Sequence, residues 1–86
     1  MQAYIDHQKI YTKKPSNKLF SHLIVRGTLN DLHAFAAKIH VGKHFFHATP
    51  YPHYDISSTH FQNALNASAT LITTRQLILI AKANVQ

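Results

Sequence analysis

The sequence predicts an α/β fold with a single domain, residues 1–86, in which a small sheet of about four short strands carries three helices. Three observations predict this class. A chain of 86 residues is long enough for one hydrophobic core and too short for two domains. Hydrophobic residues make up 45% of it, with two glycines and three prolines, which is typical of a folded globule. Segments with strand composition alternate with segments that have helical periodicity.

Two strands are expected in the first third of the chain, at residues 3–6 and 19–25, because both segments are rich in apolar and β-prone residues. The intervening residues 7–18 are polar and basic. They include Pro15 and Asn17, which are typical of a turn and rare inside strands. We therefore expect a loop between the two strands.

A helix over residues 29–39 follows from an apolar stripe at three- and four-residue spacing. Thr28 and Asp31 have the spacing of an N-terminal capping box, with Asp in place of the more common Glu. Gly42 is expected to end the helix in a left-handed conformation.

The second half predicts a loop at residues 43–52, a strand at 53–56, a helix beginning at Ser57 or Ser58, and a strand at 69–72. Thr73 or Thr74 can cap a last helix over residues 75–82. Residues 77–80 would also suit a buried strand, and we favour the helix for its length and cap. This order suggests helices that cross between parallel strands.

Composition excludes several classes of protein. Without cysteine, neither a disulfide framework nor a thiolate zinc site can stabilise the fold. The longest apolar run, residues 77–81, is far shorter than the roughly 20 residues that span a bilayer. The first residues lack the features of a secretory signal, so a cytoplasmic location is expected.

The chain is basic, with a formal net charge of +6. Lys9, Lys13, Lys14 and Lys18 fall close together, and such a cluster can bind nucleic acid through counterion release or simply solvate a loop. A basic binding module for nucleic acid or an acidic protein partner is therefore one hypothesis. A homodimer would add buried surface to so small a domain, and the sequence leaves this open.

Acidic residues are scarce, and two of the three stand near strand ends, at Asp6 and Asp55. In open α/β sheets ligands gather at the carboxyl ends of strands, which makes these two acids candidates for a site. The alternative is that they pair with Lys or Arg or accept from turn amides.

His22 lies within a predicted strand that is otherwise largely apolar, and it needs a partner. It is either a satisfied core histidine or, with Asp6 or Asp55 in reach, a general base. Arg75, at the start of the last helix, can hold an anion or form an ion pair with Asp55.

The eight histidines do not by themselves predict a metal site. His40, His44 and His47 would align on a helix, but Gly42 and the following loop argue against that helix. No metal ligands are predicted. There is also no glycine-rich phosphate loop, and the sequence indicates no particular cofactor.

Taken together, the motifs resemble a small bacterial and phage family of unknown function, DUF4031, over nearly the whole chain. The resemblance rests on Tyr4-Ile5-Asp6, Ser21-His22-Leu23, Asp31-Leu32-His33-Ala34-Phe35-Ala36, His53-Tyr54-Asp55-Ile56, the alanine-rich residues 64–69 and Thr74-Arg75-Gln76-Leu77. It implies a shared pocket rather than a shared basic surface, because the family pattern includes Asp6, His22, His33, His53, Tyr54, Asp55 and Arg75. Two positions depart from the pattern: His7 stands where an Asp is usual, and Ser68 stands near a usual glycine.

The leading hypothesis is a ligand-binding or catalytic pocket for a phosphate-bearing small molecule or nucleotide. Asp6 and Asp55 would orient His22 and His53 as catalytic residues, and Arg75 would hold an anion. Tyr54 and His33 would contribute to ligand binding. The sequence does not decide whether the domain is an enzyme.

Overall fold

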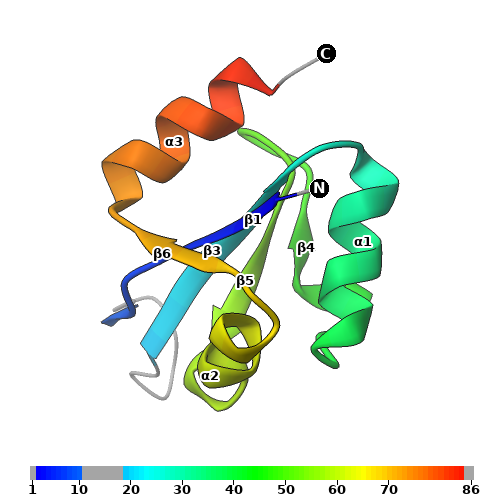
Figure 1. The fold of residues 1–86 in the computed structure, drawn as a ribbon, viewed down its shortest axis with the longest axis vertical. Coiled ribbons are helices and arrows are strands. Elements are labelled where there is room, and N and C mark those ends of the chain that lie inside the picture. Colours follow the sequence, from blue (N-terminus) through cyan, green and yellow to red (C-terminus); the bar gives the residue numbers. More distant parts are fainter. Residues whose placement is uncertain (1, 11–18, 85–86) are drawn as a thin grey trace.

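The computed structural model describes residues 2–10 and 19–84. Figure 1 shows a central sheet with α3 on one side and with α1 and α2 on the other. The elements in chain order are β1 (Gln2–Asp6), β2 (Lys9–Ile10), β3 (Leu19–Arg26), α1 (Leu29–Lys38), the short 3-10 helix η1 (Lys43–Phe45), β4 (Phe46–His47), β5 (His53–Ser57), α2 (Ser58–Asn66), β6 (Thr70–Ile72) and α3 (Thr74–Ala83). None of the helices in this described part of the chain has the length and apolar character that crossing a bilayer requires.

The sheet is mixed, which confirms the α/β class. Its strands lie in the order β4-β5-β3-β1-β6, and β2 pairs with β3. The pair β1–β6 is parallel, whereas β1–β3, β3–β5, β2–β3 and β4–β5 are antiparallel. Among the described strands only β1 and β6 are parallel neighbours, and no single helix connects these two, so the expected pattern of a helix crossing between neighbouring parallel strands is not found.

The strand count also differs from expectation. The four predicted strands are present as β1, β3, β5 and β6, and the sheet contains β2 and β4 in addition. Each extra strand has two residues. So short a segment shows no alternation of apolar and polar residues, so only pairing with a neighbouring strand reveals it.

Helix α1 begins as predicted. The Thr28 hydroxyl accepts from the Asp31 backbone N–H, and the Asp31 carboxylate accepts from the Thr28 backbone N–H. Its end differs, because His40 takes the left-handed conformation, with φ of 67°, whereas Gly42 is extended, with φ of −72°. The expected glycine stop at Gly42 is therefore wrong by two residues.

Residues 74–83 form a helix, which resolves the helix-or-strand ambiguity in favour of α3. Thr73 and Gln76 form a capping box at its start. Leu77 and Ala81 are buried at four-residue spacing, while Leu79 is 61% exposed. A strand would have placed Leu77 and Leu79 on the same face, so the burial pattern is helical.

Helix α2 begins after Ser57, as expected, and buries Ala64. Beyond its end, Ser68 has φ of 79°, a left-handed conformation in which glycine avoids the steric cost of a side chain. The resemblance described above implies a glycine near this position.

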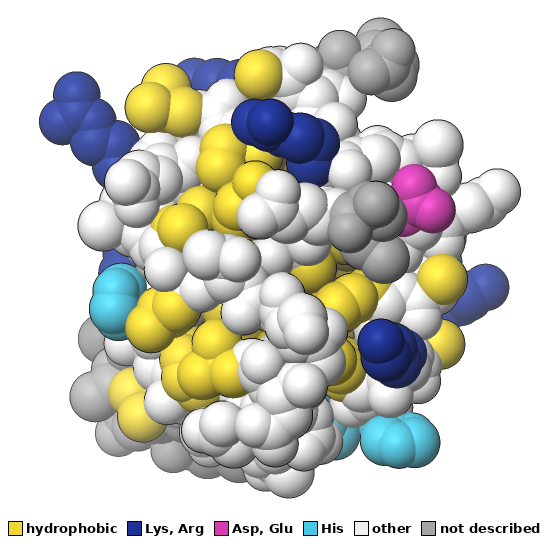
Figure 2. All heavy atoms as spheres, in the orientation of Figure 1, with side chains coloured by type: hydrophobic (Ala, Val, Ile, Leu, Met, Phe, Trp, Pro, Cys, Tyr) yellow, Lys and Arg dark blue, Asp and Glu magenta, His cyan; other side chains and the backbone are white. Residues whose placement is uncertain are grey.

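The sheet separates two hydrophobic clusters. The cluster on the α1 and α2 side includes Ile5, Leu23 and Ile56, and the cluster on the α3 side includes Tyr4, Ile24 and Leu77. Neighbouring strand residues belong to opposite clusters because side chains alternate across a sheet. Figure 2 shows that hydrophobic side chains also reach the surface, and the most exposed large ones are Leu29, Leu71 and Leu79.

Candidate functional site

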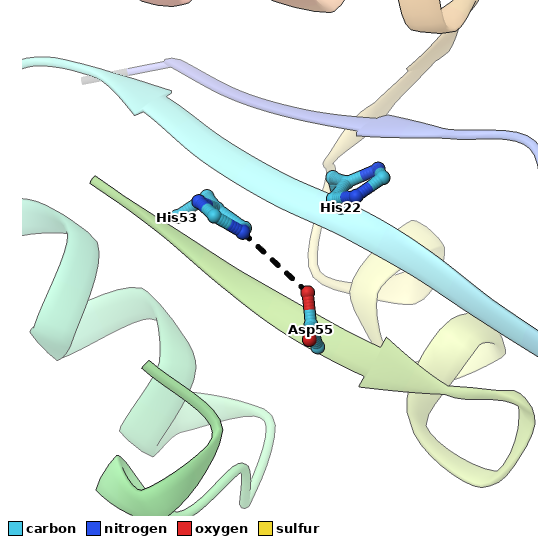
Figure 3. Close-up of side chains that lie close together, drawn as sticks. All are labelled: His22, His53 and Asp55. Carbon is cyan, nitrogen blue, oxygen red and sulfur yellow. Dashed lines mark ion pairs between the residues drawn. The ribbon is translucent and has the colours of Figure 1, made fainter. Parts of the chain in front are cut away.

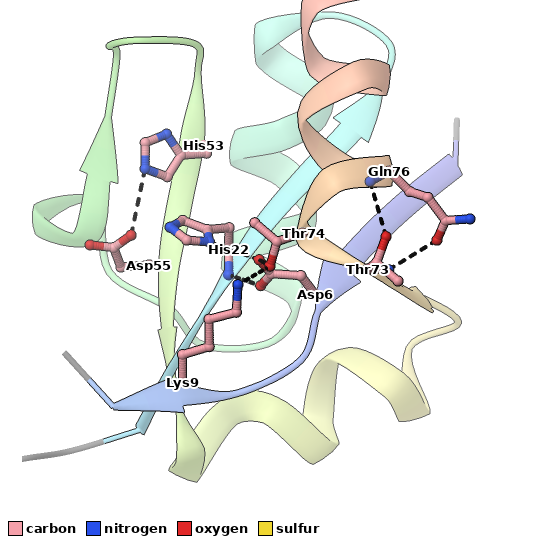
Figure 4. A network of polar contacts seen from close by, with 8 residues as sticks. All are labelled: Asp6, Lys9, His22, His53, Asp55, Thr73, Thr74 and Gln76. Atoms are coloured by element: carbon pink, nitrogen blue, oxygen red, sulfur yellow. Dashed lines mark hydrogen bonds and ion pairs between the residues drawn. The ribbon is translucent and has the colours of Figure 1, made fainter.

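A polar row crosses three neighbouring strands on the α3 side of the sheet. His22 of β3 lies directly opposite Asp55 of β5. On the other side of β3, Ile5 lies opposite Leu23, so the next position along β1 brings Asp6 beside His22. Strand register thus aligns Asp6, His22 and Asp55, and Figure 4 shows them together with His53.

This arrangement corrects the reason for which the two acids were expected to meet. Asp6 does end β1, but Asp55 lies inside β5, and β5 runs antiparallel to β3. The acids converge because alternate residues of adjacent strands share one face, not because both stand at the carboxyl ends of strands.

The helix on this side of the sheet covers only part of that face. Leu77 and Ala81 of α3 pack with Tyr4 and Ile24, and this half of the face is apolar. The other half carries the polar row, with His22 at 21% side-chain exposure. The row is therefore reachable from solvent at the edge of the α3 packing.

Asp6 is the most enclosed member of the row, with no exposed surface. Its carboxylate accepts from the His22 backbone N–H at 2.6 Å and from the Thr74 hydroxyl at 2.7 Å, and contacts His22 Nδ1 at 2.9 Å. Burial raises the pKa of Asp6, but the His22 and Thr74 hydrogen bonds outweigh burial and lower the pKa below its ordinary value of 3.8. Asp6 is therefore an ionised carboxylate at neutral pH.

The Asp6 contact sets the tautomer of His22. An ionised carboxylate only accepts hydrogen bonds, so His22 Nδ1 must carry the proton that it shares with Asp6. The lone pair of the neutral ring is then on Nε2. The Asp6 contact therefore fixes both the orientation and the electron-pair donor of His22.

A second histidine is oriented in a similar way. His53 Nδ1 lies 2.7 Å from the Tyr51 carbonyl oxygen, which only accepts, so the proton is again on Nδ1. The other nitrogen, Nε2, lies 3.5 Å from Asp55 Oδ1. The rings of His22 and His53 have centroids 5.4 Å apart, and Figure 3 shows these rings beside Asp55.

Asp55 is shared between two histidines. His47, on β4, places Nε2 at 2.9 Å from Asp55 Oδ2, while Oδ1 faces His53. Burial raises the pKa of Asp55, but the neighbouring imidazoles of His53 and His47 outweigh burial and lower the pKa below 3.8. Asp55 is also ionised at neutral pH.

The two carboxylates influence the groups around them. Burial lowers the pKa of His53, but Asp55 and the Tyr51 carbonyl outweigh it and raise the pKa above 6.5. Burial, with added repulsion from Asp6 and Asp55, raises the pKa of the Tyr51 phenol above 10.0. Tyr51 therefore stays neutral beside Asp6, His22, His53 and Asp55, which are called the histidine–aspartate cluster below.

Three of these residues can share a metal ion. His22, His53 and Asp55 each offer one ligand atom, and these atoms lie within 4.8 Å of one another. They form the metal-capable group among the described residues. His40, His44 and His47, the spacing considered from the sequence, lie after α1, in η1 and in β4, so no single helix aligns them.

Two sequence-predicted residues lie apart from this cluster. Tyr54 is 1% exposed and belongs to the hydrophobic cluster on the α1 and α2 side. Its hydroxyl lies 2.7 Å from His33 Nδ1 of α1. Burial raises the pKa of Tyr54 above 10.0. The structure brings Tyr54 and His33 to each other and not to Asp6, His22, His53 and Asp55.

Two of the cationic residues considered from the sequence, Lys9 and Arg75, lie near Thr74 at the start of α3. Arg75 is exposed in the first turn of α3, next to Thr74, and the described residues provide no ion pair between it and Asp55. Lys9 donates to the Thr74 hydroxyl and so lies beside the cluster (Figure 4). Lys13, Lys14 and Lys18 lie outside the described residues, so binding of nucleic acid through the lysine cluster stays a prediction.

Sequence reasoning missed the roles of Thr74, Tyr51 and His47. Thr74 was considered only as a helix cap, although Thr73 caps α3 and leaves the Thr74 hydroxyl to donate to Asp6. Tyr51 acts through its backbone carbonyl, which no side-chain pattern can indicate. His47 depends on β4, a strand too short to leave a sequence signal.

A cavity of about 680 Å³ opens elsewhere, between β3, the start of α1 and the end of α3. Its lining includes Ile24, Leu29, Leu32 and Ala81 and is mainly apolar. None of the residues of the histidine–aspartate cluster lines it. The histidines and aspartates that could carry chemistry therefore lie on an open stretch of the sheet and not in this cavity.

Comparison with known protein families gives a match over nearly the whole chain. A family model described as "Protein of unknown function (DUF4031)" matches residues 3–84. No curated protein and no solved structure matches the chain. The match includes Asp6, His22, His53 and Asp55.

Proposed function

Because the chain belongs to the DUF4031 family, described only as proteins of unknown function, we propose its function from the cluster itself. We propose that Asp6, His22, His53 and Asp55 form the ligand-binding or catalytic site, and that its ligand is a phosphate-bearing small molecule or nucleotide. The observation that carries the proposal is the convergence of two carboxylate–histidine pairs, His22–Asp6 and His53–Asp55, on one solvent-reachable face.

Two partly buried ionised carboxylates on the same face of a sheet lower the stability of the fold, unless they serve a function or hydrogen bonds and opposite charges fully replace their lost solvation. Asp6 is fully hydrogen-bonded, and its bonds to the backbone and ring of His22 orient that histidine, while the described lysines and arginines form no ion pair with it. A histidine whose ring and tautomer are fixed by a carboxylate is an efficient electron-pair donor. His22 and His53 are therefore suited to hold a proton or to ligate a cation at a bound substrate.

The preference for a phosphate-bearing ligand rests on positive charge beside this cluster. The Lys9 ammonium group lies next to Thr74 and Asp6, and Arg75 is exposed one residue further along α3. An ammonium point charge and a guanidinium fork both bind phosphate oxygens. The surrounding chain is also basic, with a net charge of +6, which attracts anions over longer distances.

The test is a titration of the isotope-labelled protein with inorganic phosphate and with a nucleoside monophosphate, followed by backbone amide NMR. It is run with EDTA and then with added zinc chloride, because the cluster includes metal-capable residues. We expect shifts at the end of β1, in the middle of β3 and β5 and at the start of α3. The Lys9→Ala variant should weaken binding, whereas Lys43→Ala, which removes an exposed lysine in η1, should not.

Two results would count against the proposal. One is the absence of amide shifts with either ligand at millimolar concentration in both buffers. The other is a set of shifts confined to the apolar cavity or to the exposed face of α1. Equal weakening by Lys9→Ala and Lys43→Ala would mean that binding depends on overall charge and not on this site.

A further inference from the structure

We infer that His22, His53 and Asp55 together bind a single divalent transition-metal ion of the zinc class. Two imidazoles and one carboxylate form a common protein donor set for such an ion, and three protein ligands leave a fourth position for water or substrate. The inference deepens the proposed function, on whose site it rests, by naming the cofactor of that site. Metal binding is nevertheless measurable without any phosphate ligand.

The distance between His53 Nε2 and Asp55 Oδ1 fits two ligands of one ion. At 3.5 Å it exceeds the roughly 2.7–2.9 Å of a charge-assisted hydrogen bond. Two ligand atoms each about 2.1 Å from a tetrahedral zinc ion are about 3.4 Å apart. Nitrogen and oxygen thus face each other at the spacing that a shared ion requires.

The third ligand needs only a small adjustment. All three ligand atoms lie within 4.8 Å of one another, so the widest pair must close by at most about 1.4 Å to reach the tetrahedral spacing. Figure 3 shows the three side chains beside one another on adjacent strands β3 and β5, which need not move.

Each of the three residues also has a partner that orients it. Asp6 accepts from His22 Nδ1, the Tyr51 carbonyl accepts from His53 Nδ1, and His47 Nε2 lies 2.9 Å from Asp55 Oδ2. Metal-binding histidines in proteins almost always donate their second nitrogen to a carboxylate or a backbone carbonyl. Both forms of this support occur here, one on each histidine.

The donor types select the class of ion. Imidazole nitrogen suits zinc, copper, iron and nickel, whereas magnesium and calcium prefer sites made of oxygen atoms alone. The Asp6 and Asp55 carboxylates supply negative charge close to the position of the ion. A bound ion would offer its open position to a phosphate oxygen, which agrees with the ligand class proposed above.

Isothermal titration of zinc chloride into the untagged, EDTA-treated protein tests the inference, with cobalt(II) as a spectroscopic substitute. We expect one ion per chain. His22→Ala, His53→Ala and Asp55→Asn should each abolish this binding event. Asp6→Asn should weaken it by about 10–100-fold, because the orienting partner of His22 is lost. His44→Ala, which removes an exposed histidine outside the cluster, should leave it unchanged.

A second measurement covers the case in which a variant does not fold. Ring-nitrogen NMR of the unmodified protein should show zinc-induced shifts at His22 and His53 before any other histidine. Lack of zinc binding, full binding by His53→Ala, or first shifts at other histidines would each overturn the inference. Because these titrations contain no phosphate ligand, the proposed function can fail while this site stands, and the reverse also holds.

Discussion

At the scale of single residues, Asp6 shows how one buried charge serves both stability and site geometry. A carboxylate without solvent contact is tolerated because the His22 backbone, the His22 ring and Thr74 all hydrogen-bond to it. The same bonds connect the end of β1 and the start of α3 to the middle of β3. Loss of the charge should therefore affect folding as well as the site.

Asp6→Asn should lower the free energy of unfolding at neutral pH by about 1–3 kcal/mol, because an amide cannot accept from all three donors. The pKa of Asp6 in the folded protein lies below its ordinary value of 3.8. Its contribution to stability is thus complete above that value and is lost as pH falls through the lower, folded pKa. Urea unfolding at a series of pH values should show the gap between the wild type and Asp6→Asn narrowing in acid.

Asp31→Asn is the matched control for this experiment. Asp31 accepts from Thr28 in an exposed capping box, so the same substitution there should cost well below the Asp6 value, about 0.5 kcal/mol. If the difference in free energy of unfolding between the wild type and Asp6→Asn stays constant down to the most acidic measurable pH, the lowered pKa of Asp6 does not contribute to stability as described.

At the scale of elements, β5 divides its side chains between two functions. His53 and Asp55 belong to the polar row on the α3 side, while Tyr54 and Ile56 belong to the hydrophobic cluster on the opposite side. This division follows from the two-residue period of a strand. A residue in the middle of the His-Tyr-Asp motif can therefore be structural while its two neighbours form the site.

Tyr54→Phe tests this division. It removes only the hydroxyl that lies 2.7 Å from His33 Nδ1, so the free energy of unfolding should fall by about 0.5–1.5 kcal/mol. Zinc affinity and phosphate-induced shifts should stay at wild-type values, because the sheet separates Tyr54 from the cluster. Denaturant unfolding measures the free energy of unfolding, titration calorimetry the zinc affinity and amide NMR the phosphate-induced shifts, all on one preparation. A large loss of zinc affinity would show that the two faces are not independent.

At the scale of the whole molecule, stability depends on two small clusters on either side of one sheet. A chain of 86 residues buries a smaller fraction of its surface than a larger domain, so the margin of stability is narrow. Helix α3 contributes the only fully buried leucine on its side, Leu77, within the described residues. The polar row lies beside this packing and depends on it for its position.

Leu77→Ala should cost about 2–5 kcal/mol, because it removes a side chain with no exposed surface and leaves a cavity. Leu79→Ala, two residues away on the exposed side of the same helix, should change stability by less than about 0.5 kcal/mol. Thermal unfolding followed by circular dichroism compares the two variants directly. Similar melting temperatures for both would show that α3 does not pack as described.

Much of the fold was predictable because its signals are local. Thr28 with Asp31, and the threonines before α3, lie within one turn of the helices that they begin, and the apolar stripes recur within a few residues. The glycine at position 42 misled the prediction of the end of α1, since His40 takes the left-handed conformation instead. Strands β2 and β4 were missed because two residues carry no pattern.

The sequence by itself determined the domain class, the main helices and strands, and the candidates Asp6, His22, His53 and Asp55, because residue type, periodicity and capping act over short stretches of chain. Only the tertiary structure decided that these four meet while His33 and Tyr54 lie on the other side. The register of β1, β3 and β5 and the partial cover by α3 make that decision. Both are set by the packing of segments far apart in the chain, and a shift of one residue in a strand would move every side chain to the opposite face.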